Sequence, residues 1–153
     1  MTKMSGTSLV IGSTGLIGKK LIFELAKKDS EVIAIARRSI SNLPKKVSLL
    51  NINFDDFLEN GILPSCDHIY ICLGTTIKKA GSQSEFKKVD FDYCVSFAKK
   101  AREAGTTKIS LVSSVGANPY VKNFYLKTKG EVEEEIKKID FHSINIFLSL
   151  IHI

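Results

Sequence analysis

The sequence predicts an α/β fold of three layers, with helices on both faces of a doubly wound, mostly parallel sheet. Three observations predict it: short apolar segments alternate with segments of helical periodicity, the apolar segments are almost unbroken runs of Val, Ile and Leu, and a glycine-rich turn follows the first of them. Such alternation is typical of βαβ units, and such runs are typical of strands buried on both faces. The length of 153 residues fits a single domain over residues 1–153.

The positions of the apolar residues predict each element in turn. Six short segments are expected to be strands: Leu9–Ile11, Val32–Ala36, Val47–Leu50, His68–Leu73, Ile109–Val112 and Ile144–Ile151. Three stripes of helical spacing lie between them: Ile17, Leu21 and Leu25; then Phe86, Val89, Tyr93, Phe97 and Ala101; then Tyr125, Lys129, Val132 and Ile136. Gly105 is expected to end the second helix. In such a sheet the ligand crevice lies at the carboxyl ends of the strands.

The basic charge does not indicate a nucleic-acid site. Lys and Arg number 22 against 16 Asp and Glu, which gives a formal net charge of +6. The lysines are scattered over predicted helices, often beside Asp or Glu, and no basic stripe is interleaved with aromatic residues. Solvated helix faces explain this pattern better than a nucleic-acid groove does, so no nucleic-acid partner is expected.

The cysteines and the N-terminal segment predict the cellular location of the protein. Cys66, Cys72 and Cys94 are odd in number and widely spaced, so neither a disulfide framework nor a metal site is expected. The chain has no apolar run of membrane-spanning length, and its first residues lack the apolar core of a signal peptide. These features predict a soluble, cytoplasmic protein without a membrane partner.

Residues 8 to 20 are the most informative stretch, because an apolar strand breaks there into a glycine loop that opens a helix. Gly12 can take the tight turn, Gly15 lets backbone N–H groups approach phosphates, and Gly18 lets the helix pack close to the strand. The helix N-terminus adds free N–H donors and a partial positive charge. This geometry suits the pyrophosphate of a dinucleotide; the alternative is a glycine-rich turn with no ligand.

The end of the second predicted strand favours NADP over NAD. Sites for NAD usually place Asp or Glu there to bind the ribose 2′-hydroxyl, whereas this chain has Arg37, Arg38 and Ser39. Guanidinium groups cannot accept a hydrogen bond from a hydroxyl, but they bind a 2′-phosphate in charge-assisted contacts. The alternative is a pair of exposed surface arginines.

A third group of residues suggests proton transfer. Ser113 and Ser114 end the fifth predicted strand, and Tyr125 and Lys129 lie one turn apart on one face of the next helix. A neighbouring ammonium lowers the pKa of a phenol, and a serine can orient a carbonyl while the phenol gives or takes the proton. A chance Tyr-x-x-x-Lys on a lysine-rich helix is the alternative.

In this order, the three groups resemble the short-chain dehydrogenase/reductase superfamily. The resemblance is to its atypical, NAD(P)-binding and sugar-epimerase-like branch, closest to the Tat-interacting-protein type of oxidoreductase, and it covers nearly all of residues 8 to 147. It extends through Cys72-Leu-Gly-Thr-Thr76, Lys79-Ala-Gly81, Lys88-Val-Asp-Phe-Asp-Tyr93, Leu111-Val-Ser-Ser-Val-Gly116 and Phe124-Tyr-Leu-Lys-Thr-Lys-Gly-Glu-Val-Glu133. The fold that it implies is the Rossmann fold.

The resemblance also implies roles for individual residues. The pyrophosphate would be held by Gly12, Thr14, Gly15, Leu16, Ile17 and Gly18, and the 2′-phosphate by Arg37 and Arg38. The adenosine and its ribose would lie beside Leu73, Gly74 and Thr75, with Asn53 accepting a bond from the adenine amino group where many relatives have Asp. Lys129 would bind the nicotinamide ribose, and Ser114 and Tyr125 would be the reactive pair.

The end of the chain departs from that family. Relatives continue the last strand into Arg-Pro-Gly and a lobe that shapes the substrate pocket, whereas this chain ends in Phe147-Leu-Ser-Leu-Ile-His-Ile153. The sequence therefore predicts a C-terminally short NADP-binding domain without the substrate lobe. Two functions stay open: a reductase that passes hydride between NADPH and a small carbonyl or sugar-nucleotide substrate, and a catalytically weak or silent NADPH-binding sensor or interaction module. The apolar last strand predicts a homodimer or aggregation.

Overall fold

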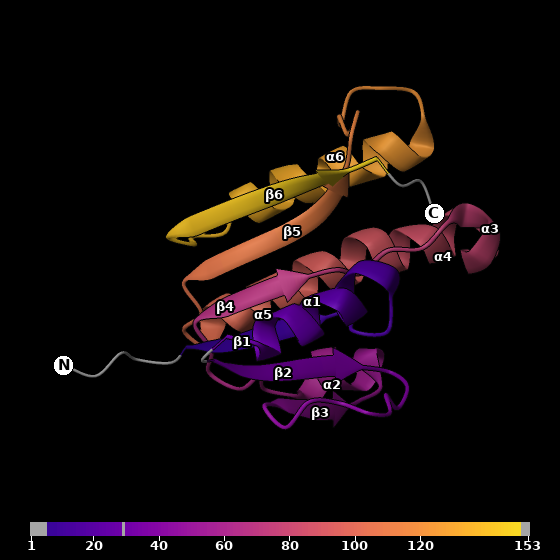
Figure 1. Ribbon diagram of the computed structural model, residues 1–153. Helices are drawn as coiled ribbons and strands as arrows, with labels where there is room; N and C mark the ends of the chain where they lie inside the picture. Colours follow the sequence, from indigo (N-terminus) through magenta and orange to yellow (C-terminus); the bar gives the residue numbers. More distant parts are fainter. Residues whose placement is uncertain (1–5, 29, 151–153) are drawn as a thin grey trace.

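The centre of the molecule is a six-stranded sheet with the strand order β3-β2-β1-β4-β5-β6 (Figure 1). The computed structural model describes residues 6–28 and 30–150. Every neighbouring pair of strands in the sheet is parallel, so the predicted doubly wound α/β fold is confirmed. The strands are β1 (Thr7–Ile11), β2 (Glu31–Ala36), β3 (Val47–Asn51), β4 (His68–Ile71), β5 (Lys108–Ser114) and β6 (Ser143–Ser149).

Helices cover both faces of this sheet. On one face α1 packs against β1 and β2, and on the other face α2, α5 and α6 lie side by side (Figure 1). The helical segments are α1 (Leu16–Ala26), α2 (Phe54–Asn60), α3 (Ile77–Ala80), α4 (Gln83–Lys87), the π-helical turn η1 (Lys88–Tyr93), α5 (Cys94–Glu103) and α6 (Phe124–Lys137).

Two hydrophobic cores hold the layers together. Successive residues of a strand point to opposite faces, so Leu9 and Ile11 of β1 join the larger core under α2, α5 and α6, whereas Val10 joins the smaller core under α1. All three side chains are fully buried. This two-sided burial explains why the strands are nearly continuous apolar runs in the sequence.

Some predicted elements differ in detail. In α1 the buried residues are Gly18, Ile22 and Leu25, whereas Ile17 and Leu21 are only half-buried, because the close approach of Gly18 to the sheet turns that face inward. The single second helix expected from the apolar stripe is divided into α4, η1 and α5. β4 ends at Ile71, two residues earlier than predicted, and Ile151 lies outside the described residues.

Because all the strands are parallel, the loops that lead from a strand to the following helix lie at the edge of the sheet formed by the carboxyl ends of the strands. Gly105 ends α5 with a φ of 99°, in the left-handed region that glycine adopts without strain, which confirms the predicted helix stop. Within residues 6–28 and 30–150, no helix has the length and apolar character needed to span a bilayer.

Candidate functional site

The glycine loop between β1 and α1 forms one wall of the candidate site. Gly12 has a φ of 87°, and a Cβ on it would lie 2.7 Å from the backbone of Cys72. A Cβ on Gly18 would lie 2.1 Å from the carbonyl oxygen of Gly12, so only glycine allows α1 to start this close to β1. Ser13 ties the loop to β1, because its buried hydroxyl donates a hydrogen bond to the Val10 carbonyl at 2.8 Å.

The N-terminus of α1 is left open toward this loop. Gly15 is the N-cap, no side chain caps the helix, and its first turn carries no acidic residue. The first N–H groups of a helix have no partner within the helix, so they and the helix dipole favour an anion here. The wall therefore has the properties that a phosphate group needs.

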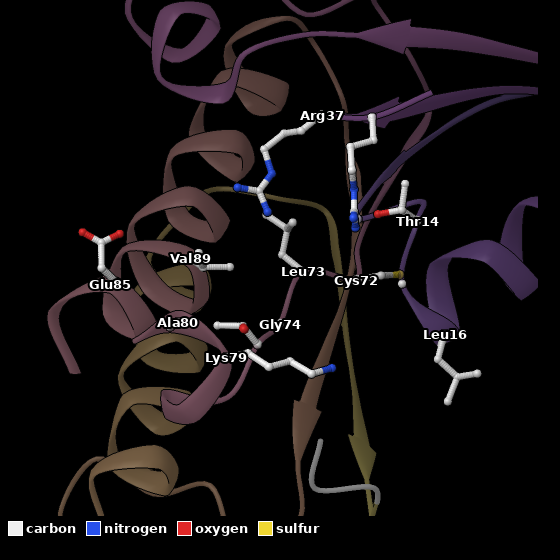
Figure 2. Close-up of a pocket in the computed structure, with 14 residues that line it drawn as sticks. Thr14, Leu16, Arg37, Cys72, Leu73, Gly74, Lys79, Ala80, Glu85 and Val89 are labelled. Carbon is white, nitrogen blue, oxygen red and sulfur yellow. The ribbon is translucent and has the colours of Figure 1, made fainter. Parts of the chain in front are cut away.

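A cleft of about 700 Å³ lies at the carboxyl ends of β1, β2 and β4, beside this open helix end (Figure 2). Arg37 and Arg38, which follow β2, supply two guanidinium groups to it, and that of Arg37 lies 5.3 Å from the centre of the Phe54 ring. Nine predicted cofactor residues line the cleft: Gly12, Thr14, Gly15, Leu16, Arg37, Arg38, Leu73, Gly74 and Thr75. Its other lining residues are Cys72, Lys79, Ala80, Glu85 and Val89.

A smaller depression of about 90 Å³ continues from this cleft toward α6, and Ile17, Tyr125 and Lys129 line it. Gly15, Leu16, Leu73, Gly74 and Thr75 belong to both hollows, so the two form one continuous surface. The Nζ atom of Lys129 lies 5.7 Å from the centre of the Tyr125 ring. The predicted phenol and ammonium are thus brought together at one end of the cleft.

The two serines at the end of β5 are oriented differently. Ser113 lines the small depression, but its hydroxyl donates to Glu133 of α6 at 2.7 Å. Ser114, the predicted reactive serine, is 1% exposed and donates to the Val115 carbonyl at 3.4 Å. Ser114 does not line either hollow.

Asp90 is a site residue that the sequence analysis missed. Its Oδ2 atom lies 2.7 Å from Nζ of Lys129, and its Oδ1 accepts a hydrogen bond from the Thr75 backbone N–H at 2.9 Å. It lies in the π-helical turn η1 and is 1% exposed. The signal in the sequence is a lone carboxylate four residues after Phe86, on the apolar stripe of the predicted helix.

Burial and charge act in opposite directions on the Asp90–Lys129 pair. Burial alone favours the neutral amine, but the Asp90 carboxylate holds the pKa of Lys129 above its ordinary value. Burial raises the pKa of the Asp90 carboxyl, while Lys129 and the Thr75 N–H favour the carboxylate. With two donors within 3 Å, we assign the pair as ionised at neutral pH.

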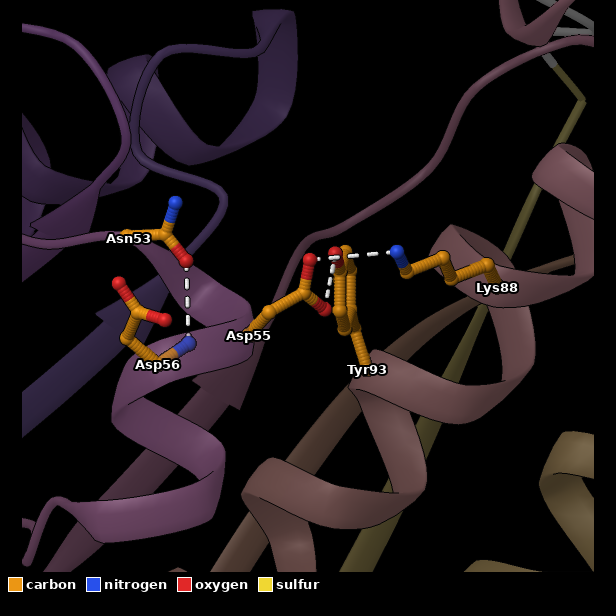
Figure 3. A network of polar contacts seen from close by, with 5 residues as sticks. All are labelled: Asn53, Asp55, Asp56, Lys88 and Tyr93. Carbon is orange, nitrogen blue, oxygen red and sulfur yellow. Dashed lines mark hydrogen bonds and ion pairs between the residues drawn. The ribbon is translucent and has the colours of Figure 1, made fainter.

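Asn53 caps α2, and it does not line either hollow. Its side-chain oxygen accepts from the Asp56 N–H at 3.0 Å (Figure 3). Beside it, Asp55 accepts a hydrogen bond from the Tyr93 hydroxyl at 2.9 Å and pairs with Lys88 at 3.2 Å. These two partners hold the pKa of the Asp55 carboxyl below its ordinary value. This network ties α2 to η1 at the edge of the site.

Comparison with known proteins identifies related sequences. The model of the NAD-dependent epimerase/dehydratase family matches residues 8–141. The protein FMP52 of Candida albicans, mitochondrial by its name, is 33% identical over 143 residues, which cover 88% of this chain and 62% of FMP52. Protein HTATIP2 of Rattus norvegicus is 32% identical over 152 residues, which cover 95% of this chain and 62% of the relative. The chain thus spans about three fifths of the length of these relatives.

Solved structures share the fold at low sequence identity. Human epimerase family protein SDR39U1, solved with NADPH, matches with a TM-score of 0.69 and 18% identity, over 92% of this chain and 52% of its own. MoeE5, in complex with UDP-glucose and NAD, matches with a TM-score of 0.73 and 15% identity, over 92% of this chain and 53% of its own. Both have the same three-layer arrangement of strands and helices.

The comparison corrects the predicted location. Several relatives at 32–34% identity, among them FMP52 of Candida albicans and of Saccharomyces cerevisiae, are mitochondrial by name, so the prediction of a cytoplasmic protein is wrong. The lack of an apolar signal-peptide core bears on secretion and not on import into mitochondria, which uses a different kind of segment.

Proposed function

Because the chain belongs to the NAD-dependent epimerase/dehydratase family, we propose that its cleft binds NADP(H) and that Tyr125 exchanges a proton with a carbonyl or alcohol substrate. One observation carries the proposal: two guanidinium groups and an uncapped helix N-terminus line the same cleft, at the carboxyl ends of parallel strands. The family and the fold already establish an NAD(P)-binding type of domain. The choice of NADP and the reaction are the proposal.

The preference for NADP follows from the charges at the end of β2. Arg37 and Arg38 line the cleft where a 2′-phosphate would lie, and no carboxylate follows β2 to accept from a ribose hydroxyl. Contact of its guanidinium with the Phe54 ring limits the freedom of Arg37, which favours binding to a phosphate. If the arginines were only surface residues, NADH and NADPH would bind alike.

The other cofactor residues have the roles expected for a dinucleotide. Gly12, Gly15 and Gly18 with Thr14, Leu16 and Ile17 would hold the pyrophosphate at the start of α1, and Leu73, Gly74 and Thr75 would flank adenosine and ribose. Lys129 would bind the nicotinamide ribose. Asn53 would reach the adenine amino group only with the second lone pair of its side-chain oxygen, since the first accepts from Asp56.

NADPH supplies a hydride when it is bound; the protein supplies position and a proton. Tyr125 lies at the end of the cleft with Lys129 near its ring, and its hydroxyl is the group that would give a proton to, or take one from, the substrate oxygen. Ser114 would orient the carbonyl after its hydroxyl turns away from the Val115 carbonyl. The substrate class we propose is a small carbonyl compound or a sugar nucleotide.

A second candidate function is an NADPH-binding module with little or no turnover. The observation that favours it is the burial of Ser114, together with a depression of only about 90 Å³ beside Tyr125. Such a module would bind the dinucleotide in the same cleft, and a partner protein would distinguish the dinucleotide-bound form from the free form. Both candidates share the cofactor and differ only in chemistry.

We further propose that the protein associates with a second copy through β6. Among the described residues β6 pairs only with β5, and Phe147 and Leu148 are 59% and 55% exposed. An apolar edge strand offers unpaired backbone groups and apolar area to another chain. A dimer through this edge would cover both.

NADPH oxidation measured over quinones, aldehydes and sugar nucleotides separates the two candidate functions. The reductase requires turnover with at least one class of substrate, and that turnover must fall when Tyr125 is replaced by Phe. Tight NADPH binding without turnover over the whole panel would favour the silent module. Failure to bind either dinucleotide would contradict both.

A further inference from the structure

The wall of the cleft opposite the glycine loop carries a cation that the proposed cofactor roles leave unused. Lys79, in the short helix α3, lines the cleft together with Ala80. Its side chain extends into the cleft toward the first turn of α1, where Leu16 lies, and away from the guanidinium of Arg37 (Figure 2). No carboxylate of the described residues lies within ion-pair distance of its ammonium.

The position of Lys79 is set by a well-defined turn. The Thr76 hydroxyl accepts from the Lys79 backbone N–H at 3.0 Å and so caps α3, and Gly81 ends the helix with a φ of 95°. The next helix is capped in the same way by Ser82. The cap on α3 uses the backbone N–H of Lys79 and not its side chain, so a substitution of that side chain leaves the turn intact.

The positive charges of the cleft are arranged in two places. Arg37 and Arg38 lie together at the end of β2, and Lys79 lies across from the start of α1. The start of α1 contributes only N–H groups and the helix dipole, whereas a pyrophosphate carries two negative charges. A cation on the opposite wall would therefore contact the side of the pyrophosphate that the glycine loop cannot reach.

We propose that Lys79 binds the pyrophosphate of the dinucleotide from α3, opposite the N-terminus of α1. The proposal rests on the proposed NADP(H) function of the cleft. In this arrangement the two cation positions have separate tasks: Arg37 and Arg38 distinguish NADPH from NADH, and Lys79 adds affinity for both.

Lys78 is a matched control, because it is the neighbouring lysine of α3 and does not line the cleft. Calorimetric titration of Lys79→Ala should show affinities for NADPH and NADH that both fall about five- to tenfold, with their ratio unchanged. Lys78→Ala should bind both as the wild type does. Lys79→Ala should bind ADP-ribose, which has the pyrophosphate, more weakly than the wild type does. It should bind 2′-AMP, which lacks the pyrophosphate, as tightly as the wild type does.

Two results would overturn the proposal while leaving the proposed function in place. One is unchanged binding of both dinucleotides by Lys79→Ala, which would make Lys79 a solvated surface residue. The other is a loss confined to NADPH and 2′-AMP, which would assign Lys79 to the 2′-phosphate. A wild-type protein that binds neither dinucleotide would instead contradict the proposed function, and this inference with it.

Discussion

The ammonium nitrogen of Lys129 lies 2.7 Å from Oδ2 of Asp90, and both side chains are almost completely buried. The same carboxylate accepts the Thr75 N–H, so Asp90 links α6 to the loop after β4. A Cβ on Gly74 would lie 3.7 Å from Nζ of Lys129, so the pair lies directly beneath that loop. Asp90 therefore holds the ammonium of Lys129 at the end of the cleft where Tyr125 lies.

The first prediction concerns the stability of this pair. Asp90→Asn and Lys129→Met should each lower the free energy of unfolding by about 3 kcal/mol or more, because each leaves one buried charge unpaired. The double variant Asp90→Asn/Lys129→Met should lose clearly less than the sum of the two. Urea denaturation of the four proteins measures this cycle. Additive losses would mean that the two charges do not interact.

The second prediction concerns the approach of α1 to β1. Gly18→Ala should lower the free energy of unfolding by about 2 kcal/mol or more, because the new Cβ would lie 2.1 Å from the Gly12 carbonyl oxygen. Gly15→Ala is the matched variant in the same loop, and its Cβ would be 3.5 Å from that oxygen, an ordinary contact. It should remain as stable as the wild type but bind NADPH more weakly. Equal stability of the two variants would contradict this account of the loop.

The third prediction concerns the proton at Tyr125. Tyr125→Phe keeps the ring that packs against Phe86 and removes only the hydroxyl, so NADPH affinity should hardly change. With a substrate that the wild type reduces, kcat should fall by about 10² or more. Tyr120→Phe is the control, since Tyr120 is 92% exposed and does not line the site. Undiminished turnover by Tyr125→Phe would make the Tyr-Lys spacing a coincidence of packing.

The fourth prediction concerns β6, the strand through which we propose that two copies associate. Replacing Phe147 and Leu148 by Ser should shift the protein toward the monomer in multi-angle light scattering, because it removes exposed apolar side chains from the strand proposed to associate. The exposed Ile62, at 86%, provides the control, and Ile62→Ser should leave the mass unchanged. A wild-type protein that stays monomeric at every concentration would contradict association through β6.

Much of this fold follows from the sequence because its signals are local. The runs Leu9–Ile11 and Val32–Ala36 are apolar at every position, since both faces of these strands are buried, and the glycine spacing fixes where α1 begins. The strands and the wrapping of helices on both faces were predictable for that reason. The burial of Ile22 in place of Leu21 was not, because it depends on how closely Gly18 approaches Gly12.

The features that the sequence did not predict depend on contacts between distant segments. Asp90 meets Lys129 only because η1 and α6 pack together, and the π-helical turn has no distinct apolar pattern of its own. Lys79 lines the cleft only because the loop after β4 leads to α3 on the wall opposite α1. For Ser114, the predicted role depended on its place in a motif, whereas the direction of its hydroxyl depends on the backbone of Val115.

The proposed function of the cleft depends above all on a preference for NADPH over NADH. Calorimetric titration of the wild-type protein should show NADPH binding at least tenfold tighter than NADH, a difference of about 1.4 kcal/mol. In Arg37→Ala/Arg38→Ala the affinity for NADPH should fall to that for NADH, while NADH binding stays the same, because the proposal assigns the guanidinium groups to the 2′-phosphate alone. Equal affinities in the wild type, or a double variant that binds NADPH as tightly as before, would contradict the account.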